Sequence, residues 1–392
     1  MKNFSLNQWL SIAISLSFAF SANAQTAFFK TYEVFDDNQY SSQVYNLQAR
    51  ETTDGFELYS PTYAQNFSIQ VDADGHFRSM EENDLRSVSI FDPIYRTRKG
   101  EFVYSIQNDT TPIKTFRIVD PAGDLQQEFV FHLPKGRTIK GNVEELPDGN
   151  LLAAFTSSDT LPHWEQTTFR IHYALLNRAN GLIENHRSFE TNVRSATIGR
   201  LAWVEDYFLL QYEVRPFSSP YVHTAKIVDW EREWDHSPFG SKRIYSTWEP
   251  STDGGYWYNE GNNSPILSKH GADTDGSLWW DALQGHIAAA ISHPQGVLTL
   301  HNRPNGFLIR NLAQDGTTRN MHFIDHSEFS IPPTIRGGER TRDGEFIFWG
   351  SVFDGTKSIP CILKLNQDGE WDRPGYEPVS YTHLTLPTTP YV

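Results

Sequence analysis

Short apolar runs separated by turn residues make up most of the chain. Residues 346–350 form one run, which follows an Asp-Gly pair, and residues 361–365 form another, which ends just before a second Asp-Gly pair. Asp-Gly between apolar runs is a strong signal for a β-hairpin. Long stretches with the 3.6-residue period of an amphipathic helix are absent from the sequence. The pattern therefore predicts an all-β protein.

The hairpin phrase recurs along the chain and defines a repeat. Each copy has a first turn, an apolar strand, a loop, a second strand and a second turn, and the copy around Asp206 lacks glycine at both turns. The spacings between successive first turns are 45, 49, 57, 48, 42 and 48 residues. The first turns fall at Gly55, Gly100, Gly149, Asp206, Gly254, Gly296 and Gly344.

Two hairpins per repeat give about four strands per unit, which is the composition of a propeller blade. An open β-solenoid would have a shorter and stricter period, and a pair of sandwiches would not keep one phrase throughout. We therefore predict a single β-propeller with seven four-stranded blades, six or eight being the alternatives.

The repeated phrase resembles the repeats of exported bacterial β-propeller proteins, which are common in Bacteroidetes-like organisms. The resemblance covers residues 27–372 and implies architecture, not activity. In that family the outermost strand is similar to residues 28–32, Phe-Phe-Lys-Thr-Tyr, which here lie near the N-terminus. We expect this segment to close the ring by pairing beyond the strand around residues 361–366, which would remove two sheet edges. Residues 370–376 are the competing candidate for that place.

Both ends of the chain carry segments that we exclude from the fold. Residues 1–24 combine a basic start, a short apolar run and an Ala-x-Ala ending, which are the parts of a secretory signal peptide. We therefore expect a protein that is secreted, displayed on the cell surface or periplasmic. Residues 379–392 begin with a run that matches a translated sequencing adapter, so we interpret them as a non-native tail. The propeller is expected to span residues 25–378.

Composition narrows the possible partners. The net charge of -15 argues against nucleic acid and against adsorption to anionic lipid. No segment after the signal peptide is apolar enough to span a membrane, and we expect a monomer. The single cysteine, Cys361, excludes a disulfide within the chain and is expected to be a buried core residue.

Basic residues recur beside glycines in the strands that precede the first turns, which should be the innermost strands of the blades. We predict that they converge at the mouth of the central channel and bind an anionic ligand such as a uronate or a sulfated sugar. Alternatively, they are rim residues that pair with Glu144, Glu249 or Glu339. The predicted ligand-binding residues are Lys140, Arg200, His286, Arg336, Arg96 and Trp248.

Other candidate chemistry is weaker. Asp72-Ala73-Asp74-Gly75 and the similar residues 273–276 resemble pieces of calcium loops, although aspartate before glycine is also ordinary turn chemistry. Tryptophans could stack on sugar rings or pack between blades; they are Trp203, Trp248, Trp257, Trp279 and Trp280. No metal or cofactor motif is complete in the sequence, so calcium is the one cofactor we consider.

The favoured function is a non-catalytic binding or scaffold propeller for a glycan or a protein, held at the channel mouth. The alternative is a carbohydrate-active enzyme, either a polysaccharide lyase or a glycoside hydrolase, acting on an anionic polysaccharide. Fold does not decide between them, because propellers carry both kinds of function. Paired acid and base groups with shifted pKa values would favour the enzyme.

Overall fold

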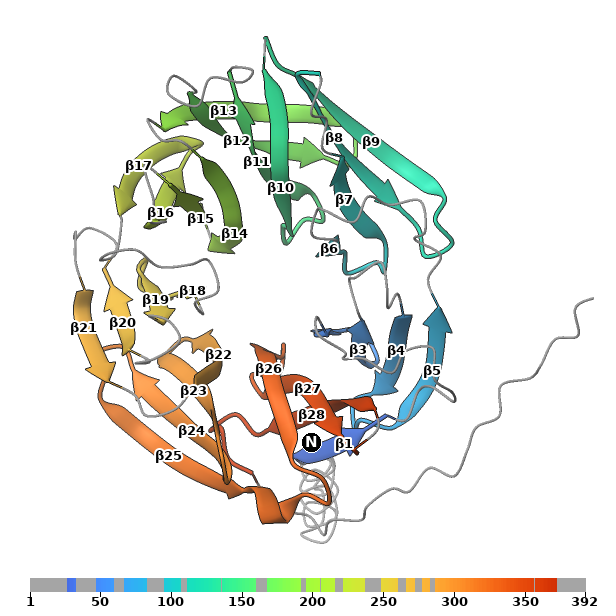
Figure 1. Ribbon diagram of the computed structural model, residues 1–392, viewed down its shortest axis with the longest axis vertical. Helices are drawn as coiled ribbons and strands as arrows, with labels where there is room; N and C mark the ends of the chain where they lie inside the picture. Colours follow the sequence, from blue (N-terminus) through green and yellow to red (C-terminus); the bar gives the residue numbers. More distant parts are fainter. Residues whose placement is uncertain are drawn as a thin grey trace, which may run out of the picture.

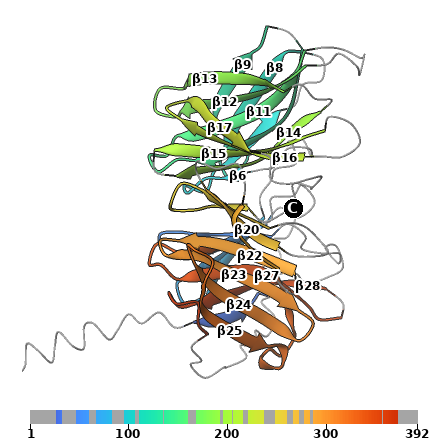
Figure 2. The same ribbon diagram turned by 90° about the vertical axis from the view of Figure 1, so that its left-hand side faces the viewer.

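A computed structural model gives the architecture of the chain. The described residues form seven four-stranded antiparallel sheets arranged around a common axis (Figure 1), and Figure 2 shows the same ring from the side. This confirms the predicted all-β propeller. The structure describes residues 27–32, 47–59, 67–82, 95–106, 111–134, 136–159, 168–191, 195–204, 206–215, 221–236, 248–259, 266–271, 277–282, 286–355 and 357–371.

Each sheet is one blade, numbered here in chain order with the innermost strand first. Blade 1 contains β2 (Gln48–Glu51), β3 (Gly55–Tyr59), β4 (Phe67–Asp72) and β5 (Phe77–Glu82). Blade 2 contains β6 (Tyr95–Arg96), β7 (Phe102–Ile106), β8 (Ile113–Val119) and β9 (Leu125–His132). Blade 3 contains β10 (Arg137–Glu145), β11 (Leu151–Ser158), β12 (Phe169–Asn177) and β13 (Leu182–Thr191). Blade 4 contains β14 (Ala196–Val204), β15 (Tyr207–Val214), β16 (Tyr221–Val228) and β17 (Glu231–His236).

The remaining blades follow the same order until the last. Blade 5 contains β18 (Trp248–Pro250), β19 (Tyr256–Asn259), β20 (Ile266–His270) and β21 (Ser277–Ala282). Blade 6 contains β22 (His286–His293), β23 (Gly296–Arg303), β24 (Gly306–Ala313) and β25 (Thr318–Asp325), and the 3-10 helix η1 (His326–Glu328) follows it. Blade 7 contains β26 (Pro333–Arg340), β27 (Phe346–Phe353), β28 (Ser358–Leu365) and, outermost, β1 (Phe28–Thr31).

One hairpin turn is used at most of the repeat's corners. At the first turn of blade 3, the N–H of Gly149 donates to the carbonyl of Leu146 at 2.9 Å, and the N–H of Leu146 donates to the carbonyl of Asn150 at 2.8 Å. Gly149 has φ +85°, a left-handed conformation that glycine adopts without steric cost. The second turn of blade 4, between β16 and β17, forms without glycine. Asp229 and Trp230 both take left-handed conformations there, with φ of 48° and 66°.

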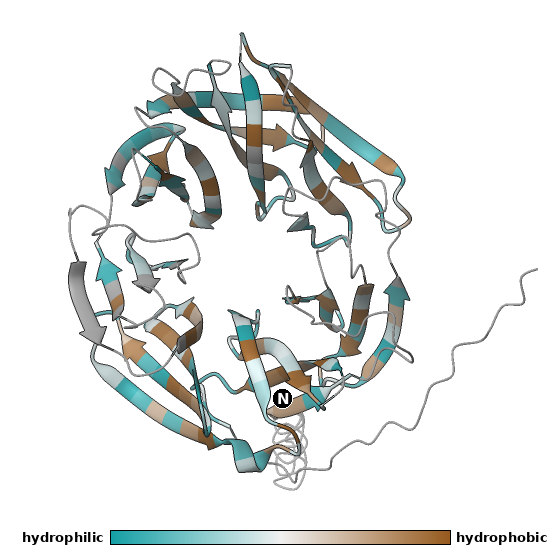
Figure 3. Cartoon of the chain, in the orientation of Figure 1, coloured by the Kyte–Doolittle hydropathy of each residue, from teal (hydrophilic) through white to brown (hydrophobic). Residues whose placement is uncertain are grey.

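The hydrophobic core lies between neighbouring blades. One cluster joins Leu152 and Ile171 of blade 3 to Leu210 and Ile227 of blade 4, all buried. The alternation of apolar and polar residues along the strands is visible in Figure 3. Cys361 is fully buried, as its apolar neighbours predict, and burial raises the pKa of its thiol far above the usual range.

Polar contacts also link each blade to the next. Each such contact joins two neighbouring blades. Going around the ring from blade 1, the contacts are Arg96 Nη2 to Glu57 Oε1 at 2.6 Å, Arg178 Nη2 to Glu101 Oε1 at 2.7 Å, Asn142 Nδ2 to Gly199 O at 2.8 Å, Arg200 Nη2 to Glu249 Oε1 at 3.5 Å, Lys269 Nζ to Gln314 Oε1 at 2.8 Å, Asn302 Nδ2 to Ile335 O at 2.8 Å and Glu51 N to Glu339 Oε1 at 2.9 Å.

The N-terminal strand β1 joins the two ends of the described chain. It runs antiparallel to β28, with Phe29 opposite Leu363 and Thr31 opposite Cys361. The ring of Phe29 also meets Phe329 edge-on at a centroid distance of 4.7 Å. The outer place of blade 7 is therefore held by β1, and Trp371, from the competing segment, instead packs its ring against Phe329.

Some predictions concern residues that the structure does not describe. The signal peptide, residues 1–24, and the adapter-derived tail, residues 379–392, lie outside the described residues. Within the part of the chain that is described, no helix has the length and hydrophobicity needed to cross a bilayer.

Candidate functional site

The innermost strands of four blades are interrupted at equivalent places. Pairing shifts between Thr138 and Gly141 in β10 and between Ile198 and Leu201 in β14. The same shift occurs around Ala288 in β22 and around Arg336 in β26. These are β-bulges, which bend a strand and redirect its side chains and are common beside active sites. The glycine phrases around Gly141, Gly199 and Gly337 therefore mark bulges, whereas the bulge of β22 lies beyond the phrase that contains His286.

Three of the predicted basic residues occupy these bulges. Lys140, Arg200 and Arg336 are the bulge positions of blades 3, 4 and 7. The side chain of Arg200 is 48% exposed and lies 3.5 Å from a carboxylate oxygen of Glu249. Arg336 is also exposed. The contact joins the half-exposed Arg200 to the partly buried Glu249, and it is long for a charge-assisted hydrogen bond.

Two other predicted residues lie on innermost strands but with undescribed side chains. His286 begins β22, two residues before the bulge, and Trp248 begins β18. The side chain of Lys140 is likewise outside the description. Their register places His286 and Trp248 away from the bulges, so the structure does not bring them to the position shared by Lys140, Arg200 and Arg336.

Arg96 is in a different environment from the one predicted. It is only 5% exposed, and its guanidinium lies 2.6 Å from Glu57, which is fully buried. The guanidinium also lies over the ring of Phe102 at 4.5 Å, and burial lowers the pKa of Arg96. Its charge is thus neutralised inside the junction of blades 1 and 2, rather than presented to a ligand as the sequence analysis predicted.

Three glutamates form a second row, nearer the first turns. Glu144, Glu249 and Glu339 each stand two residues before the residue that opens the first turn of their blade. Glu249 of blade 5 repels both Glu144 of blade 3 and Glu339 of blade 7. Since these blades are not neighbours in the ring, the interactions must act across the axis. The three carboxyls therefore face a shared axial space.

Burial changes the acidity of this row. It raises the pKa of Glu144 to about 7 and that of Glu339 to about 8, with repulsion from Glu249 adding to both shifts. Burial also raises the pKa of Glu249, which Arg200 opposes. Glu339 accepts a hydrogen bond from the N–H of Glu51 at 2.9 Å. Carboxyls with such pKa values can hold or exchange a proton near neutral pH.

The sequence pattern indicated these glutamates only as alternative partners for the basic residues. Arg200 does pair with Glu249, as that alternative expected. The same pattern did not reveal that the acidic residues form a row of their own. The available signal was their common offset from the first turn, which becomes meaningful only once the blades are known to share an axis.

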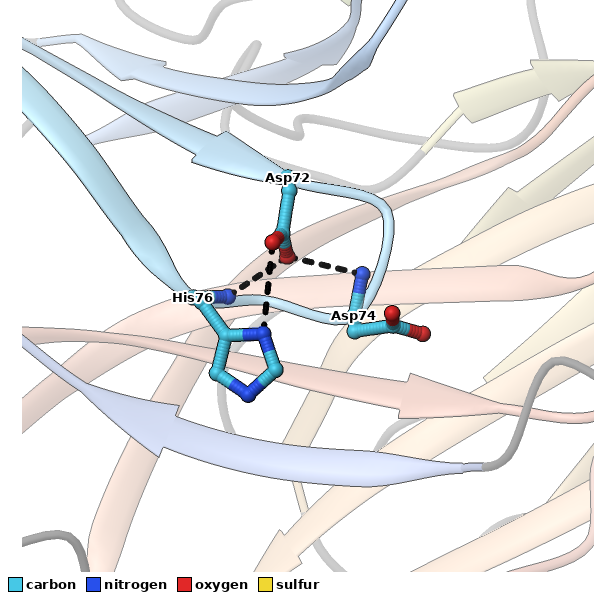
Figure 4. Close-up of side chains that lie close together, drawn as sticks. All are labelled: Asp72, Asp74 and His76. Atoms are coloured by element: carbon cyan, nitrogen blue, oxygen red, sulfur yellow. Dashed lines mark hydrogen bonds and ion pairs between the residues drawn. The ribbon is translucent and has the colours of Figure 1, made fainter.

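One acidic turn brings three possible metal ligands together. Asp72, Asp74 and His76 place ligand atoms within 4.8 Å of one another in the β4–β5 hairpin (Figure 4). Asp72 Oδ1 already accepts the N–H groups of Asp74 and His76, at 3.0 and 2.8 Å. Burial opposes ionisation of Asp72, but hydrogen bonds from His76 and Asp74 lower its pKa.

The same hydrogen bonds recur where no such ligand set exists. At the turn after β28, Asn366 Oδ1 accepts the N–H groups of Asp368 and Glu370. The side chain before the turn therefore has a structural role in both blades, with an amide replacing the carboxylate. Calcium at Asp72 stays a prediction, and residues 273–276 lie outside the described residues.

The tryptophans that the structure describes support packing. Trp257 is fully buried, and the Lys269 ammonium lies over its ring at 5.3 Å. Trp203 is half-buried and stacks on Phe208 at a centroid distance of 6.4 Å. The side chains of Trp248, Trp279 and Trp280 are outside the description.

Comparison with known proteins agrees with the architecture. No protein-family model and no curated protein matches the sequence. Among solved structures, BBS1N in complex with ARL6DN is similar over 88% of this chain and 100% of its own, with 8% identity and a TM-score of 0.50. The polysaccharide lyase Uly1 is similar over 88% of this chain and 98% of its own, with 8% identity and a TM-score of 0.49. The Dos1 propeller is similar over 78% of this chain and 75% of its own, with 11% identity and a TM-score of 0.47.

At these identities the similarity extends to the fold alone. The chain is a β-propeller, and its distinguishing local features are the bulged inner strands and the glutamate row beside them.

Proposed function

We propose that this protein is an exported, monomeric binding propeller that holds a glycan or a protein ligand at the axial end of the ring. The main support is the equivalent bulge in β10, β14 and β26, which carries Lys140, Arg200 and Arg336. The similar position of the bulge in these three blades supports a shared level for positions 140, 200 and 336 around the axis. Acidic groups of a ligand, such as uronate or sulfate, would bind to them by charge-assisted hydrogen bonds.

The glutamate row complements this basic level. Glu144 and Glu339 lie three or four residues beyond the bulge cations of the same strands. Their carboxyls, like that of Glu249, can accept hydrogen bonds from sugar hydroxyls, and in protonated form can donate them. A ligand with acidic and hydroxyl groups would therefore meet both rows at once. Uronate-containing oligosaccharides fit this description better than neutral ones.

The test is a thermal-shift and calorimetric titration of residues 25–378 with neutral, uronate and sulfated oligosaccharides. We expect binding of an acidic sugar that is lost in the Arg200→Gln, Arg336→Gln double variant. Arg187→Gln, on outer strand β13 where Arg187 is exposed, is the matched control and should bind normally. Binding that survives the double variant, or no binding of any acidic sugar, would remove the glycan proposal and direct the search to protein partners.

The shifted carboxyls favour one second candidate, an enzyme acting on an anionic polysaccharide. Glu339 and Glu144 are protonated for much of the neutral range and so could serve as general acids of a glycoside hydrolase or act in a lyase. Product analysis by mass spectrometry would distinguish the two functions. An enzyme should release shortened oligosaccharides, and Glu339→Gln should abolish that release. Absence of products with a sugar that binds would favour the binding propeller.

A further inference from the structure

Blade 3 contains a chain of three polar side chains that leads outward from its second strand. Ser157 Oγ lies 2.8 Å from Nε2 of His172, and Nδ1 of His172 lies 3.1 Å from Nε2 of His186. The three residues are on adjacent strands β11, β12 and β13. Ser157 and His172 are buried, at 2% and 4% exposure, whereas His186 is exposed on the outer strand.

Aromatic rings fix the orientation of both imidazoles. The His172 ring stacks on Phe155 at 4.7 Å with an interplanar angle of 8°. The His186 ring meets Phe131 of blade 2 edge-on at 5.2 Å. Two imidazole nitrogens are thus held facing each other in a rigid setting, with one of the two rings reachable from solvent.

We propose that His172 and His186 form a two-histidine site for a divalent transition metal of the zinc, copper or nickel kind. Zinc–nitrogen bonds are about 2.0–2.1 Å long, and at a tetrahedral angle two such nitrogens lie about 3.4 Å apart. The observed separation of 3.1 Å is a few tenths of an ångström shorter, and binding would also turn the rings so that both lone pairs point at the metal. Water would complete the coordination on the solvent side.

The second nitrogen of each ring is suitably placed for this role. With a metal bound, His172 carries its proton on Nε2 and donates to Ser157 Oγ, and His186 carries its proton on Nδ1. Ligating histidines usually donate their other N–H in this way, which fixes the tautomer. If both rings start neutral, binding changes tautomers and releases no proton.

Nearby charges do not oppose a cation strongly. Arg170, whose charge acts on His172, is paired with Glu190 and lies 3.8 Å from Asp159. Arg187, beside His186, lies 3.3 Å from Glu231. Imidazole ligands without carboxylates favour zinc, copper and nickel over calcium and magnesium, which makes the ion class testable.

The experiment is a titration of residues 25–378 with Cu²⁺ and Zn²⁺, read by thermal shift and, for copper, by electron paramagnetic resonance. We expect one saturable equivalent with two imidazole nitrogens in the copper spectrum, which neither Ca²⁺ nor Mg²⁺ displaces. His186→Ala should remove this equivalent, and its exposed position should leave the fold intact. His132→Ala, an exposed histidine of β9, and His76→Ala should retain it.

A positioning role of Ser157 gives a second measurement. Removing an outer-shell partner typically weakens metal affinity about 10–100-fold, so Ser157→Ala should weaken binding to that extent without abolishing it. A copper equivalent that persists in His186→Ala, or a wild-type protein that binds neither metal, would overturn the proposal and leave the histidine pair as a simple hydrogen bond.

Discussion

At the scale of single residues, position around the axis determines the chemistry of a side chain. Glu339 and Glu345 lie six residues apart on either side of one turn. Glu345 is buried and pairs with Lys364 Nζ at 2.7 Å. Glu339 instead shares an axial space with other carboxyls, and burial raises its pKa to about 8. Burial with a cation neutralises a carboxylate, whereas burial beside like charges favours its protonated form.

Stability should respond to Glu339 in a defined pH window. Its usual pKa is 4.5 and its folded pKa is about 8, so between these values the folded state keeps a proton that the unfolded state has lost. The stability contributed by that proton is present below pH 4.5 and is lost as pH rises through 8. Glu339→Gln should therefore be more stable than wild type at pH 9, on the order of 2 kcal/mol, and about equal at pH 4.

Chemical denaturation across this pH range measures the effect. Glutamine keeps the oxygen that accepts the N–H of Glu51, so the comparison isolates the charge. Glu81→Gln, at an exposed position, is the control and should follow the wild-type curve. Parallel curves for wild type and Glu339→Gln would show that Glu339 titrates normally.

At the scale of elements, the first-turn hairpin is set by backbone conformation. Gly149 has φ +85°, and an added Cβ would meet nothing within 4 Å. Gly55 has φ +151°, and its added Cβ would lie 2.2 Å from the carbonyl oxygen of Val71. Substitution of Gly149 would therefore incur only the cost of an unfavourable backbone conformation. Substitution of Gly55 would add a steric clash with the backbone.

Alanine substitution should distinguish these two costs. Gly149→Ala should destabilise the protein by about 1–2 kcal/mol, the cost of a left-handed conformation for a residue with Cβ. Gly55→Ala should cost clearly more, because backbone must move. Gly149→Asn should recover part of the loss, since asparagine tolerates this region. Equal losses at Gly55 and Gly149, measured by urea denaturation, would contradict the assigned geometry.

At the scale of the whole molecule, blade 7 is assembled from both ends of the described chain. Four residues of β1 cover the outer edge of β28, and Phe29 contributes to the core between blades 6 and 7. The closing contacts also include the hydrogen bond from the hydroxyl of Tyr32 to the carbonyl of Gly75 at 2.9 Å. Losing β1 would uncover an apolar sheet edge, which promotes aggregation.

A chain that begins at residue 33 should be much less stable than one that begins at residue 25. We expect a large fall in melting temperature, or aggregation at a concentration where the longer chain stays monomeric by light scattering. A synthetic peptide of residues 25–36 should restore part of the stability by pairing with β28. An unchanged melting temperature in the shorter chain would mean that closure contributes little.

Much of the fold could be predicted because its determinants are local. These determinants are the turn glycines, the alternation within each strand and the repeat length. Each can be recognised in a stretch of about fifty residues. The basic bulge residues were also found in this way, because glycine beside Lys140, Arg200 and Arg336 marks each bulge. The degenerate copy around Asp206 was recognised from its apolar runs alone.

The sequence by itself determined the hairpins and the repeat, because each depends on neighbouring residues and on backbone preferences that every copy expresses. Only the tertiary structure decided which charges meet. Arg96 and Glu57 come together across a blade junction, and Glu144, Glu249 and Glu339 come together across the axis, although up to 195 residues separate them. Their burial and pKa values follow from these long-range distances, which no local pattern encodes.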